Sequence, residues 1–402
     1  MADQAFEVVV FGATGFTGRL VAEHLLARHG ASGGLRWAIA GRNRGKLERV
    51  RADLAAPDLP IVTADATDVP SLEALARGAA VVISTVGPYQ HHGESVLASC
   101  VATGTDYVDL CGEPHWMAAM IARYEDAATC SGARVVFSCG FDSIPFDCGV
   151  FHLQQSAQAR FGQPARRVRC RVRSMKGTFS GGTAASMLAT LAAARRDRSV
   201  AATLANPFAL AGAARGPEQP AGDRAMYEPD IPSWSAPFVM APINTKNVHR
   251  TNHLLRQRYG ADFVYDEMVM TGDGAAGERR ARRLVRKSRL YDRLLRLAPA
   301  RALLRRFVLA QPGQGPSEEQ RRAGMFDLLF LGETSDGRSV RASVTGDMDP
   351  GYGSTSKMIA ESALCLLDVS REVTPGGIWT PAAAMGGALV ERLQAHAGLR
   401  FA

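Results

Sequence analysis

Residues 8–18 read VVVFGATGFTG, an apolar run followed directly by three glycines at G-x-x-G-x-x-G spacing. The run predicts a buried strand, and residues 16–29 have the pattern of a helix. Gly12 allows a sharp turn, Gly15 lets phosphate oxygens approach the backbone, and Gly18 allows close packing of helix on strand. The free N–H groups and positive dipole of the helix end favour an anion. The stretch therefore predicts a dinucleotide-binding site.

The residues after the second predicted strand, 35–40, bear on which dinucleotide binds. NAD-specific proteins usually carry an acidic residue at this point for the ribose hydroxyls, whereas this chain has Gly41-Arg42-Asn43. Arg42 offers a planar cation suited to a 2′-phosphate, and Arg44 and Lys46 add positive potential. We therefore expect NADPH rather than NADH. The alternative is that Arg42 only begins a solvated helix.

Strands and helices alternate through the first 150 residues. Further apolar strands are predicted at 59–64, 79–84 and 133–137, with helices at about 43–55, 70–78, 91–103 and 115–130. This alternation predicts an α/β fold of the Rossmann type, with a doubly wound parallel sheet. Ligands collect at the carboxyl ends of such strands. The predicted cofactor-binding residues are therefore Gly12, Ala13, Thr14, Gly15, Phe16, Thr17, Gly18, Gly41, Arg42, Asn43, Asp65, Thr85, Val86, Gly87 and Pro88.

Ten segments spread almost end to end carry a family resemblance. They are GATGFTG (12–18), AGR (40–42), TVGPY (85–89), GTDYVDLCGEP (104–114), CGFDSIPFD (139–147), FSGGTAAS (179–186), APFVMAPIN (236–244), PSEEQRRAG (316–324), DPGYGSTSKM (349–358) and TPAAAMG (380–386). On these motifs the chain resembles the saccharopine dehydrogenase-like oxidoreductases, and among them the bacterial trans-acting enoyl reductases. The resemblance implies a nicotinamide-dependent oxidoreductase. Better-known relatives reduce double bonds in long polyketide-derived lipids, and more distant ones handle saccharopine.

The length of 402 residues, with 46% apolar residues, suits two domains. We expect an NADP-binding domain at 1–148, completed by helices within 350–402, because the final helices of related two-domain oxidoreductases pack back on the nucleotide-binding sheet. An α+β substrate domain is expected at 149–349. Its predicted elements are a strand at 166–175, a helix from about 180 to 194, an extended loop at 206–244 that contains seven prolines and could cover the active site, and a hairpin at 326–345.

Two residues are predicted to be catalytic. Tyr89 follows the predicted strand 79–84 and Asp142 follows the predicted strand 133–137, so both lie at strand ends that converge on the nicotinamide. Reduction of a double bond needs a proton donor as well as an oriented nicotinamide. No tyrosine has a lysine four residues later, which disfavours short-chain dehydrogenase chemistry. The alternatives are that Tyr89 is a packed aromatic residue and that Asp142 caps the helix starting near Ser143.

The segment 278–309 concentrates the positive charge of the chain. It holds twelve basic and two acidic residues, a net charge of +10, whereas the whole chain is +8. Apolar residues recur between the charges at helical spacing, and Pro299 would interrupt the helix. A basic amphipathic helix suits an anionic membrane surface. The alternatives are packing on its own domain and docking to an acidic acyl-carrier domain.

Several classes of function are disfavoured by composition. No apolar stretch is long enough to span a bilayer, and Asp3 and Glu7 do not fit a secretory signal, so we expect a cytoplasmic protein. The seven cysteines lack metal-ligand spacing and are expected to be reduced thiols without metal. No nucleic-acid-binding motif accompanies the basic charge. The sequence is compatible with a homo-oligomer.

These observations together predict an NADPH-dependent reductase of a lipidic, α,β-unsaturated acyl or polyketide-type substrate in lipid or glycolipid biosynthesis. We expect it to act at or near the inner face of the cytoplasmic membrane as a peripheral protein, on a substrate that an acyl-carrier domain could present. The alternatives are an amino-acid dehydrogenase of the saccharopine type and a nucleotide-binding, lipid-associated protein without turnover.

Overall fold

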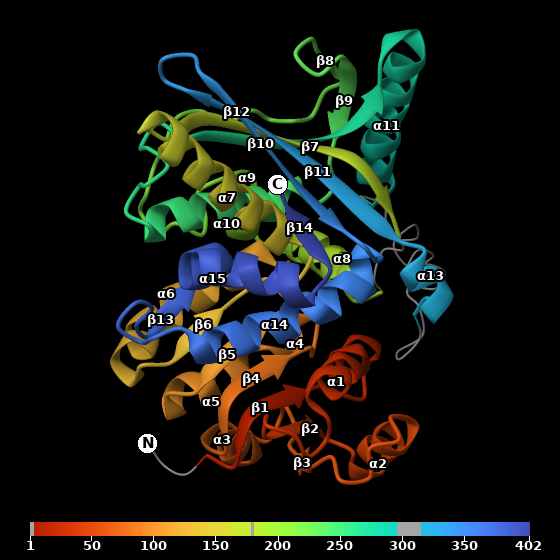
Figure 1. The fold of residues 1–402 in the computed structure, drawn as a ribbon, viewed down its shortest axis with the longest axis vertical. Helices are drawn as coiled ribbons and strands as arrows, with labels where there is room; N and C mark the ends of the chain where they lie inside the picture. Colours follow the sequence, from red (N-terminus) through yellow and green to blue (C-terminus); the bar gives the residue numbers. More distant parts are fainter. Residues whose placement is uncertain (1–3, 178–180, 296–314) are drawn as a thin grey trace.

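The structure is a computed structural model that describes residues 4–177, 181–295 and 315–402. Two seven-stranded sheets lie one above the other, with helices between them (Figure 1). The first sheet is built mainly from the N-terminal part of the chain and the second from the middle part. The C-terminal segment contributes one strand to each sheet.

The first sheet is parallel throughout, in the order β3-β2-β1-β4-β5-β6-β13. Its strands are β1 (Phe6–Phe11), β2 (Trp37–Gly41), β3 (Ile61–Thr63), β4 (Ala79–Ser84), β5 (Asp106–Asp109), β6 (Arg134–Val136) and β13 (Gly377–Trp379). This is the strand order of doubly wound dinucleotide-binding sheets. The predicted fold class is therefore confirmed, although β5 was not among the predicted strands.

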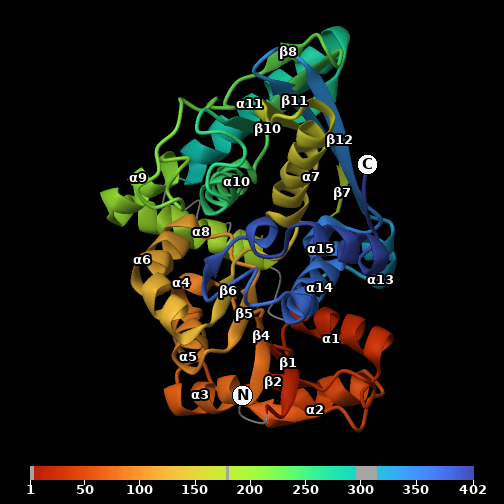
Figure 2. The same cartoon turned by 60° about the vertical axis from the view of Figure 1, so that its left-hand side comes forward.

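Helices cover both faces of this sheet, as double winding requires (Figure 2). They are α1 (Phe16–His29), α2 (Arg44–Asp53), α3 (Val69–Arg77), α4 (Tyr89–His92), α5 (Glu94–Thr103), α6 (Pro114–Ser131) and α14 (Thr355–Asp368). Helix α14 packs beside α1 and against β4 and β5, so a C-terminal helix returns to the first sheet. The apolar side chains of β1 are fully buried from Val8 to Val10, which explains the uninterrupted apolar run in the sequence.

The second sheet is mixed, in the order β14-β12-β11-β7-β10-β9-β8, and only β7 and β10 are parallel neighbours. Its strands are β7 (Ala165–Lys176), β8 (Met226–Glu228), β9 (Ser233–Pro237), β10 (Val264–Gly272), β11 (Met325–Thr334), β12 (Ser339–Gly346) and β14 (Leu399–Phe401). The remaining helices are α7 (Ile144–Phe161), α8 (Gly181–Arg196), α9 (Arg198–Ala205), α10 (Ala241–Leu254), α11 (Gly274–Leu295), α13 (Glu318–Arg322), the π-helical turn η1 (Pro350–Ser354) and α15 (Pro381–His396). Helices α7 and α10 lie on the face of this sheet that is turned toward the first sheet (Figure 1).

The structure differs from the expected domain limits in two places. The expected boundary at 148/149 falls inside α7, which runs unbroken through that point and packs on the second sheet. The last strand, β14, pairs with β12, so the end of the expected 350–402 segment belongs to the second sheet rather than to the first. The N-terminal segment therefore passes from the first sheet to the second at α7, and the segment 350–402 passes from the first sheet to the second before β14.

The proline-rich stretch 206–244 is not one extended loop, as the sequence suggested. It contains β8 and β9, and its last residues begin α10. Pro237 is tolerated because it ends β9 rather than standing in the middle of a strand. The hairpin predicted at 326–345 is present as β11 and β12.

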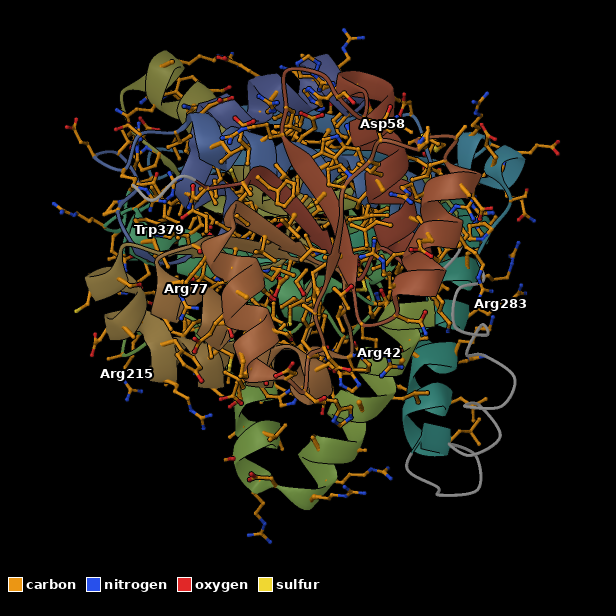
Figure 3. The ribbon with its side chains drawn as sticks, turned by 90° about the horizontal axis from the view of Figure 1, so that it is seen from below. Arg42, Asp58, Arg77, Arg215, Arg283 and Trp379 are labelled. Atoms are coloured by element: carbon orange, nitrogen blue, oxygen red, sulfur yellow. The ribbon has the colours of Figure 1, made fainter. Side chains whose placement is uncertain are left out.

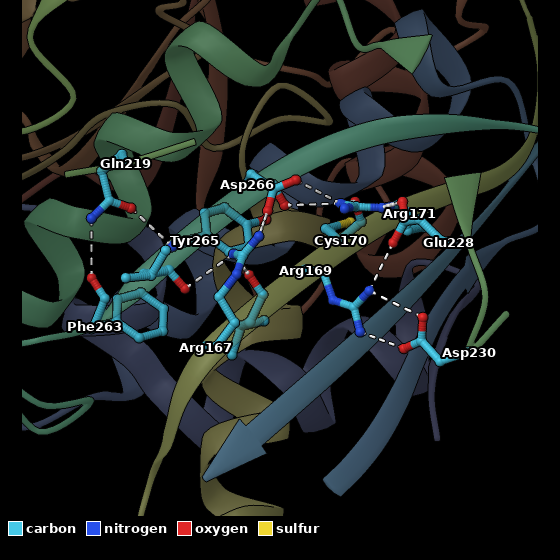
Figure 4. A network of polar contacts seen from close by, with 12 residues as sticks. Arg167, Arg169, Cys170, Arg171, Gln219, Glu228, Asp230, Phe263, Tyr265 and Asp266 are labelled. Carbon is cyan, nitrogen blue, oxygen red and sulfur yellow. Dashed lines mark hydrogen bonds and ion pairs between the residues drawn. The ribbon is translucent and has the colours of Figure 1, made fainter. Parts of the chain in front are cut away.

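Strand β7 carries arginines at alternate positions, so their side chains share one face of the second sheet. Arg171 is fully buried; its Nη1 lies 2.8 Å from Asp266 Oδ2, and it also pairs with Glu228. Arg169 reaches the same Glu228 at 2.9 Å (Figure 4). A buried guanidinium needs such partners, so this network joins β7 to β8 and β10 and has a structural role.

Candidate active site

Two glycines of the 12–18 loop are required by the fold itself. Gly12 has φ +94°, and a Cβ there would lie 2.7 Å from Thr85 Oγ1 and 2.8 Å from Val86 Cγ2. A Cβ on Gly18 would lie 2.3 Å from the Gly12 carbonyl oxygen, so α1 rests directly on the turn. Both positions therefore exclude any side chain, and the expected close approach of helix to strand at Gly18 is present.

Gly15 differs from these two glycines because it faces open space. A Cβ there would meet only the Gly12 carbonyl oxygen, at 3.2 Å. Thr14 and Gly15 are exposed, Phe16 and Thr17 are half-buried, and Ala13 is buried under the loop. The fold thus leaves room at Gly15 that a pyrophosphate could occupy.

The head of α1 also has the electrostatics of an anion site. Its N-cap is Gly15, which has no capping side chain, and the first turn carries no acidic residue. In contrast, α2 is capped by Asn43, whose Oδ1 accepts a hydrogen bond from Lys46 N at 2.9 Å. The first N–H groups of α1 are therefore available to phosphate oxygens, and the residues present fit the pyrophosphate of a dinucleotide.

The segment after β4 packs against the glycine loop through Thr85 and Val86. The Thr85 hydroxyl lies 3.2 Å from Phe11 O and 3.3 Å from Gly12 O, and Val86 packs against Gly12. Gly87 and Pro88, joined by a cis peptide bond, then lead into α4. The predicted residues of this segment therefore lie beside the glycine loop.

Three predicted residues follow β2 and β3: Arg42, Asn43 and Asp65. The side chains of Asn43 and Asp65 form hydrogen bonds with nearby residues, whereas Arg42 is exposed to solvent. Arg42 is exposed and forms no ion pair within the described ranges (Figure 3). Asp65 accepts hydrogen bonds from Thr67 N and Thr67 Oγ1, both at 2.9 Å, which hold the pKa of that carboxyl below its usual value. Asn43 is used as the cap of α2. Arg42 is thus the group at this edge best able to bind a 2′-phosphate.

The hydroxyl of Tyr89 both donates and accepts a hydrogen bond within the fold. Its hydroxyl donates to Ser84 O at 3.0 Å and accepts from Leu110 N at 3.0 Å, and its ring contacts Trp116. Burial raises the pKa of the phenol well above its usual value of 10. This geometry favours the alternative that Tyr89 is a packed aromatic residue, because its proton already lies on a backbone carbonyl.

Asp142 has the opposite environment. It lies in the loop between β6 and α7, and burial raises the pKa of its carboxyl from 3.8 to about 6. Its contact in the described residues is with Thr183 Oγ1, 3.5 Å from Oδ2. The N-cap of α7 is Ser143, and Asp142 accepts no N–H from that helix. The structure thus leaves a carboxyl with few bonds at the carboxyl end of β6.

Helix α8 connects this carboxyl with the glycine loop. Tyr352 of η1 accepts a hydrogen bond from Gly181 N at 2.9 Å, and its ring packs edge-on against Phe16 with centroids 4.8 Å apart. Two residues after Gly181, Thr183 contacts Asp142. A chain of contacts therefore runs from the head of α1 through the first turn of α8 to Asp142.

Two residues of this region, Glu113 and Arg321, were not singled out from the sequence. Glu113 is completely buried; its carboxylate accepts Tyr89 N at 2.8 Å and Gln90 N at 3.0 Å, and Ser186 Oγ of α8 at 2.7 Å. It therefore holds α8 over the strand ends. Arg321 of α13 lies over the Phe16 ring, 5.7 Å from its centroid. The motifs 104–114 and 316–324 contain these residues, but nothing local indicates their distant partners.

Other site classes find little support in the structure. All seven cysteines are free, and six of them are buried. In residues 4–177, 181–295 and 315–402, no group of three or more His, Cys, Asp or Glu could hold a metal ion. Within the same ranges no helix is both long and apolar enough to cross a bilayer.

Comparison with known proteins gives the family. Residues 8–136 match the family model described as the saccharopine dehydrogenase NADP binding domain. A Mycobacterium tuberculosis protein named as a candidate trans-acting enoyl reductase is 40% identical over 97% of this chain and 96% of its own length. A Mycobacterium bovis protein named trans-acting enoyl reductase is 35% identical over 98% of this chain and 96% of its own. The chain belongs to the saccharopine dehydrogenase-like trans-acting enoyl reductases.

The solved structures agree on the fold of this enoyl reductase relative. Apo saccharopine dehydrogenase (L-Glu forming) from Saccharomyces cerevisiae superposes with a TM-score of 0.56, at 12% identity, over 99% of both chains. The family match and the names of the relatives show that the protein is an NADP-dependent oxidoreductase. The glycine loop and the missing acidic residue after β2 had predicted this class.

Proposed function

We propose that this protein is an NADPH-dependent reductase of carbon–carbon double bonds in lipidic acyl or polyketide-type substrates of lipid or glycolipid biosynthesis. The observation that carries the proposal is Asp142, a half-buried carboxyl whose pKa of about 6 suits proton donation, connected through α8 to the head of α1. Relatives that share the whole chain bear the name enoyl reductase, which supports the same chemistry.

The reduction needs one hydride and one proton. When bound, NADPH would supply the hydride that the β-carbon of an α,β-unsaturated acyl group accepts, and the electron pair of the double bond would move toward the α-carbon and carbonyl. Asp142 then gives its carboxyl proton to the α-carbon, which leaves a saturated acyl chain, NADP⁺ and an Asp142 carboxylate that takes up a proton from solvent. Burial of Asp142 supports this role because it keeps the acid protonated closer to neutral pH.

Cofactor choice in this proposal depends on Arg42. Its guanidinium has no carboxylate partner among the described residues, so it can form the bidentate contact that a 2′-phosphate favours. The cofactor phosphates would lie at the head of α1, where Gly15 leaves room. Arg321, which lies on the Phe16 ring, is within reach of the same helix end and is proposed as a further phosphate contact.

The proposed place of action is the inner face of the cytoplasmic membrane, with a substrate that an acyl-carrier domain could present. The support is the basic helix α11, whose outer half is exposed and carries both arginines and leucines. Such helices favour anionic lipid surfaces. A lipidic substrate would meet the enzyme there without leaving the membrane.

The test is oxidation of NADPH by the purified chain in the presence of a lipid extract from membranes of an actinobacterium. We expect absorbance loss from NADPH together with disappearance of an unsaturated acyl species by mass spectrometry. Saccharopine serves as the comparison substrate. Reduction of NADP⁺ in the presence of saccharopine, together with no oxidation of NADPH by any lipid fraction, would contradict the proposal and favour amino-acid dehydrogenase chemistry.

A further inference from the structure

Helix α11 presents three different faces along its length. Gly277, Ala281 and Val285, each four residues apart, are buried, and the helix contacts β9 and β10. At about 3.6 residues per turn, Arg282, Arg286, Arg289 and Arg293 fall on a second face. The third face carries three leucines with exposed fractions of 40%, 55% and 39%, namely Leu284, Leu290 and Leu294.

The arginine face forms one wall of a groove with a distant part of the chain. The groove has a volume of about 220 Å³, well above the roughly 30 Å³ that one water occupies in the liquid. Its lining consists of Arg224, Ala225, Arg282, Val285, Arg286 and Arg289. Four guanidinium groups thus surround an apolar floor, and one of them comes from the loop before β8 rather than from α11.

Among the described residues, two of the four guanidinium groups of this groove have an acidic partner and two have none. Arg282 pairs with Glu278 at 2.6 Å, and Arg224 lies 3.6 Å from Asp223. Arg286 and Arg289 make no ion pair with any described residue. The sequence 296–314, which follows the helix, contains four arginines and neither Asp nor Glu. Within the described residues the groove therefore carries unpaired positive charge, which favours the binding of an anion.

The chemistry of the two exposed faces decides among possible occupants. A second copy of this chain would oppose arginines with arginines, which costs free energy. A docking helix of another protein would favour an unbroken apolar seam, whereas Arg283 and Lys287 stand between the leucines of the third face. A lipid surface tolerates this mixture, because long cationic side chains extend from apolar depth to the phosphate level.

We propose that the groove between α11 and residues 224–225 binds the phosphate group of an anionic membrane phospholipid. Leu284, Leu290 and Leu294 would enter the acyl boundary beside it, and Arg282, Arg286 and Arg289 would contact the headgroup. This inference deepens the membrane-surface part of the proposed function by assigning a defined lipid site to it. The reductase chemistry at Asp142 does not depend on it.

The experiment measures sedimentation of the full chain with vesicles of phosphatidylcholine alone and with vesicles that also contain phosphatidylglycerol. We expect binding only to the phosphatidylglycerol vesicles. The double variant Arg286→Gln, Arg289→Gln should weaken this binding about thirtyfold, because each cation near the surface contributes roughly a factor of five. The single variant Arg224→Gln should lose about fivefold, although it lies outside α11.

The matched control is the double variant Arg196→Gln, Arg198→Gln, which removes the same charge from exposed positions on α8 and α9, away from the groove and from α11. It should weaken binding far less than the groove double variant. Equal losses from the two pairs, or no effect of Arg224→Gln, would show diffuse attraction and overturn the assigned site. NADPH affinity, measured for every variant, should stay unchanged.

Two further arms separate the sources of the anion. Inorganic phosphate should not release the protein from vesicles more than sodium chloride of equal ionic strength does; specific release by phosphate would assign the groove to a free anion and overturn the lipid proposal. Binding of an acidic acyl-carrier domain that depends on Arg286 and Arg289, without vesicle binding, would overturn it in favour of a protein partner. Failure of NADPH oxidation would leave all these vesicle results intact.

Discussion

The carboxyl ends of β4 and β6 look equivalent in the sequence, since each is followed by one polar residue suited to proton transfer. In the structure they differ. The hydroxyl of Tyr89 after β4 is held between Ser84 O and Leu110 N, whereas the carboxyl of Asp142 after β6 makes, among the described residues, one long contact with Thr183. The comparison shows that position at a strand end is not enough: a catalytic group must also be left unused by the fold.

The same contrast recurs among the cofactor-binding residues. Gly18 is required for packing, but Gly15 faces open space. Asn43 caps α2, but Arg42 beside it has no partner in the described residues. In each of these two pairs, one residue stabilises the fold and the other is available to bind the cofactor.

The largest expected effect separates the two strand ends directly. Asp142→Asn should lower the rate of reduction by about 10²–10⁴-fold, because a general acid contributes that much. Tyr89→Phe should change the rate little but lower the free energy of unfolding by about 1–3 kcal/mol, since it leaves a buried carbonyl and a buried N–H without their partner. Steady-state rates and urea unfolding check both. A large rate loss in Tyr89→Phe with normal stability would reverse the assignment.

The pH dependence of the rate sharpens the same comparison. Because burial raises the pKa of Asp142 to about 6, the proton-donating form is fully present below that pH and is lost as pH rises through it. The rate constant for reduction should therefore be level below about pH 6 and fall about tenfold per pH unit above it. Single-turnover rates measured across pH provide the check. The inflection should vanish in Asp142→Asn and persist in Tyr89→Phe; any other pattern would count against Asp142.

The two glycines provide the next contrast. Gly15→Val should weaken NADPH binding by at least about a hundredfold, roughly 2.7 kcal/mol, while the protein stays folded, because the side chain would enter the space assigned to pyrophosphate. Gly18→Ala should destabilise the fold by about 1–3 kcal/mol, because its Cβ meets the Gly12 carbonyl. Cofactor fluorescence and thermal unfolding measure the two effects. Normal binding in folded Gly15→Val would mean that the loop is only a turn.

The smallest expected effects concern the two arginines at the cofactor. Arg42→Ala should remove an expected preference of at least about tenfold for NADPH over NADH, roughly 1.4 kcal/mol. Arg321→Ala should weaken both cofactors by the same few-fold factor, because a pyrophosphate is common to them. Arg322→Ala, an exposed neighbour paired with Glu318, is the matched control. Equal affinity of the unaltered protein for NADPH and NADH would contradict the role of Arg42.

The sequence was sufficient for features that are encoded locally. The apolar run 8–11, the glycine spacing and the alternation of strands and helices predicted the parallel sheet and its cofactor loop, because buried parallel strands are continuous apolar runs. The sequence also drew attention to Tyr89 and Asp142 as candidate catalytic residues, but it did not reveal that their hydrogen bonding differs. That difference depends on Leu110 and Thr183, which come from other elements.

Features that depend on distant contacts could not be found in this way. Tyr352 meets Phe16 across more than half of the chain and Gly181 across 171 residues, and Glu113 meets Ser186 of α8. The short strands β8 and β9 carry few residues and lie among prolines, so their pairing in the second sheet overrides local propensity. The part of the predicted basic helix from 296 to 309, with Pro299, lies outside the described residues.

The most direct test of double-bond reduction by this protein is transfer of deuterium from NADPH labelled at the hydride-donating position. With a long-chain α,β-unsaturated acyl substrate, mass spectrometry should locate one deuterium at the β-carbon of the saturated product, and reaction in heavy water should add one at the α-carbon. Asp142→Asn should suppress both. Consumption of labelled NADPH without deuterium at the β-carbon, or with deuterium on an amino-bearing carbon of another substrate, would contradict the proposed reduction.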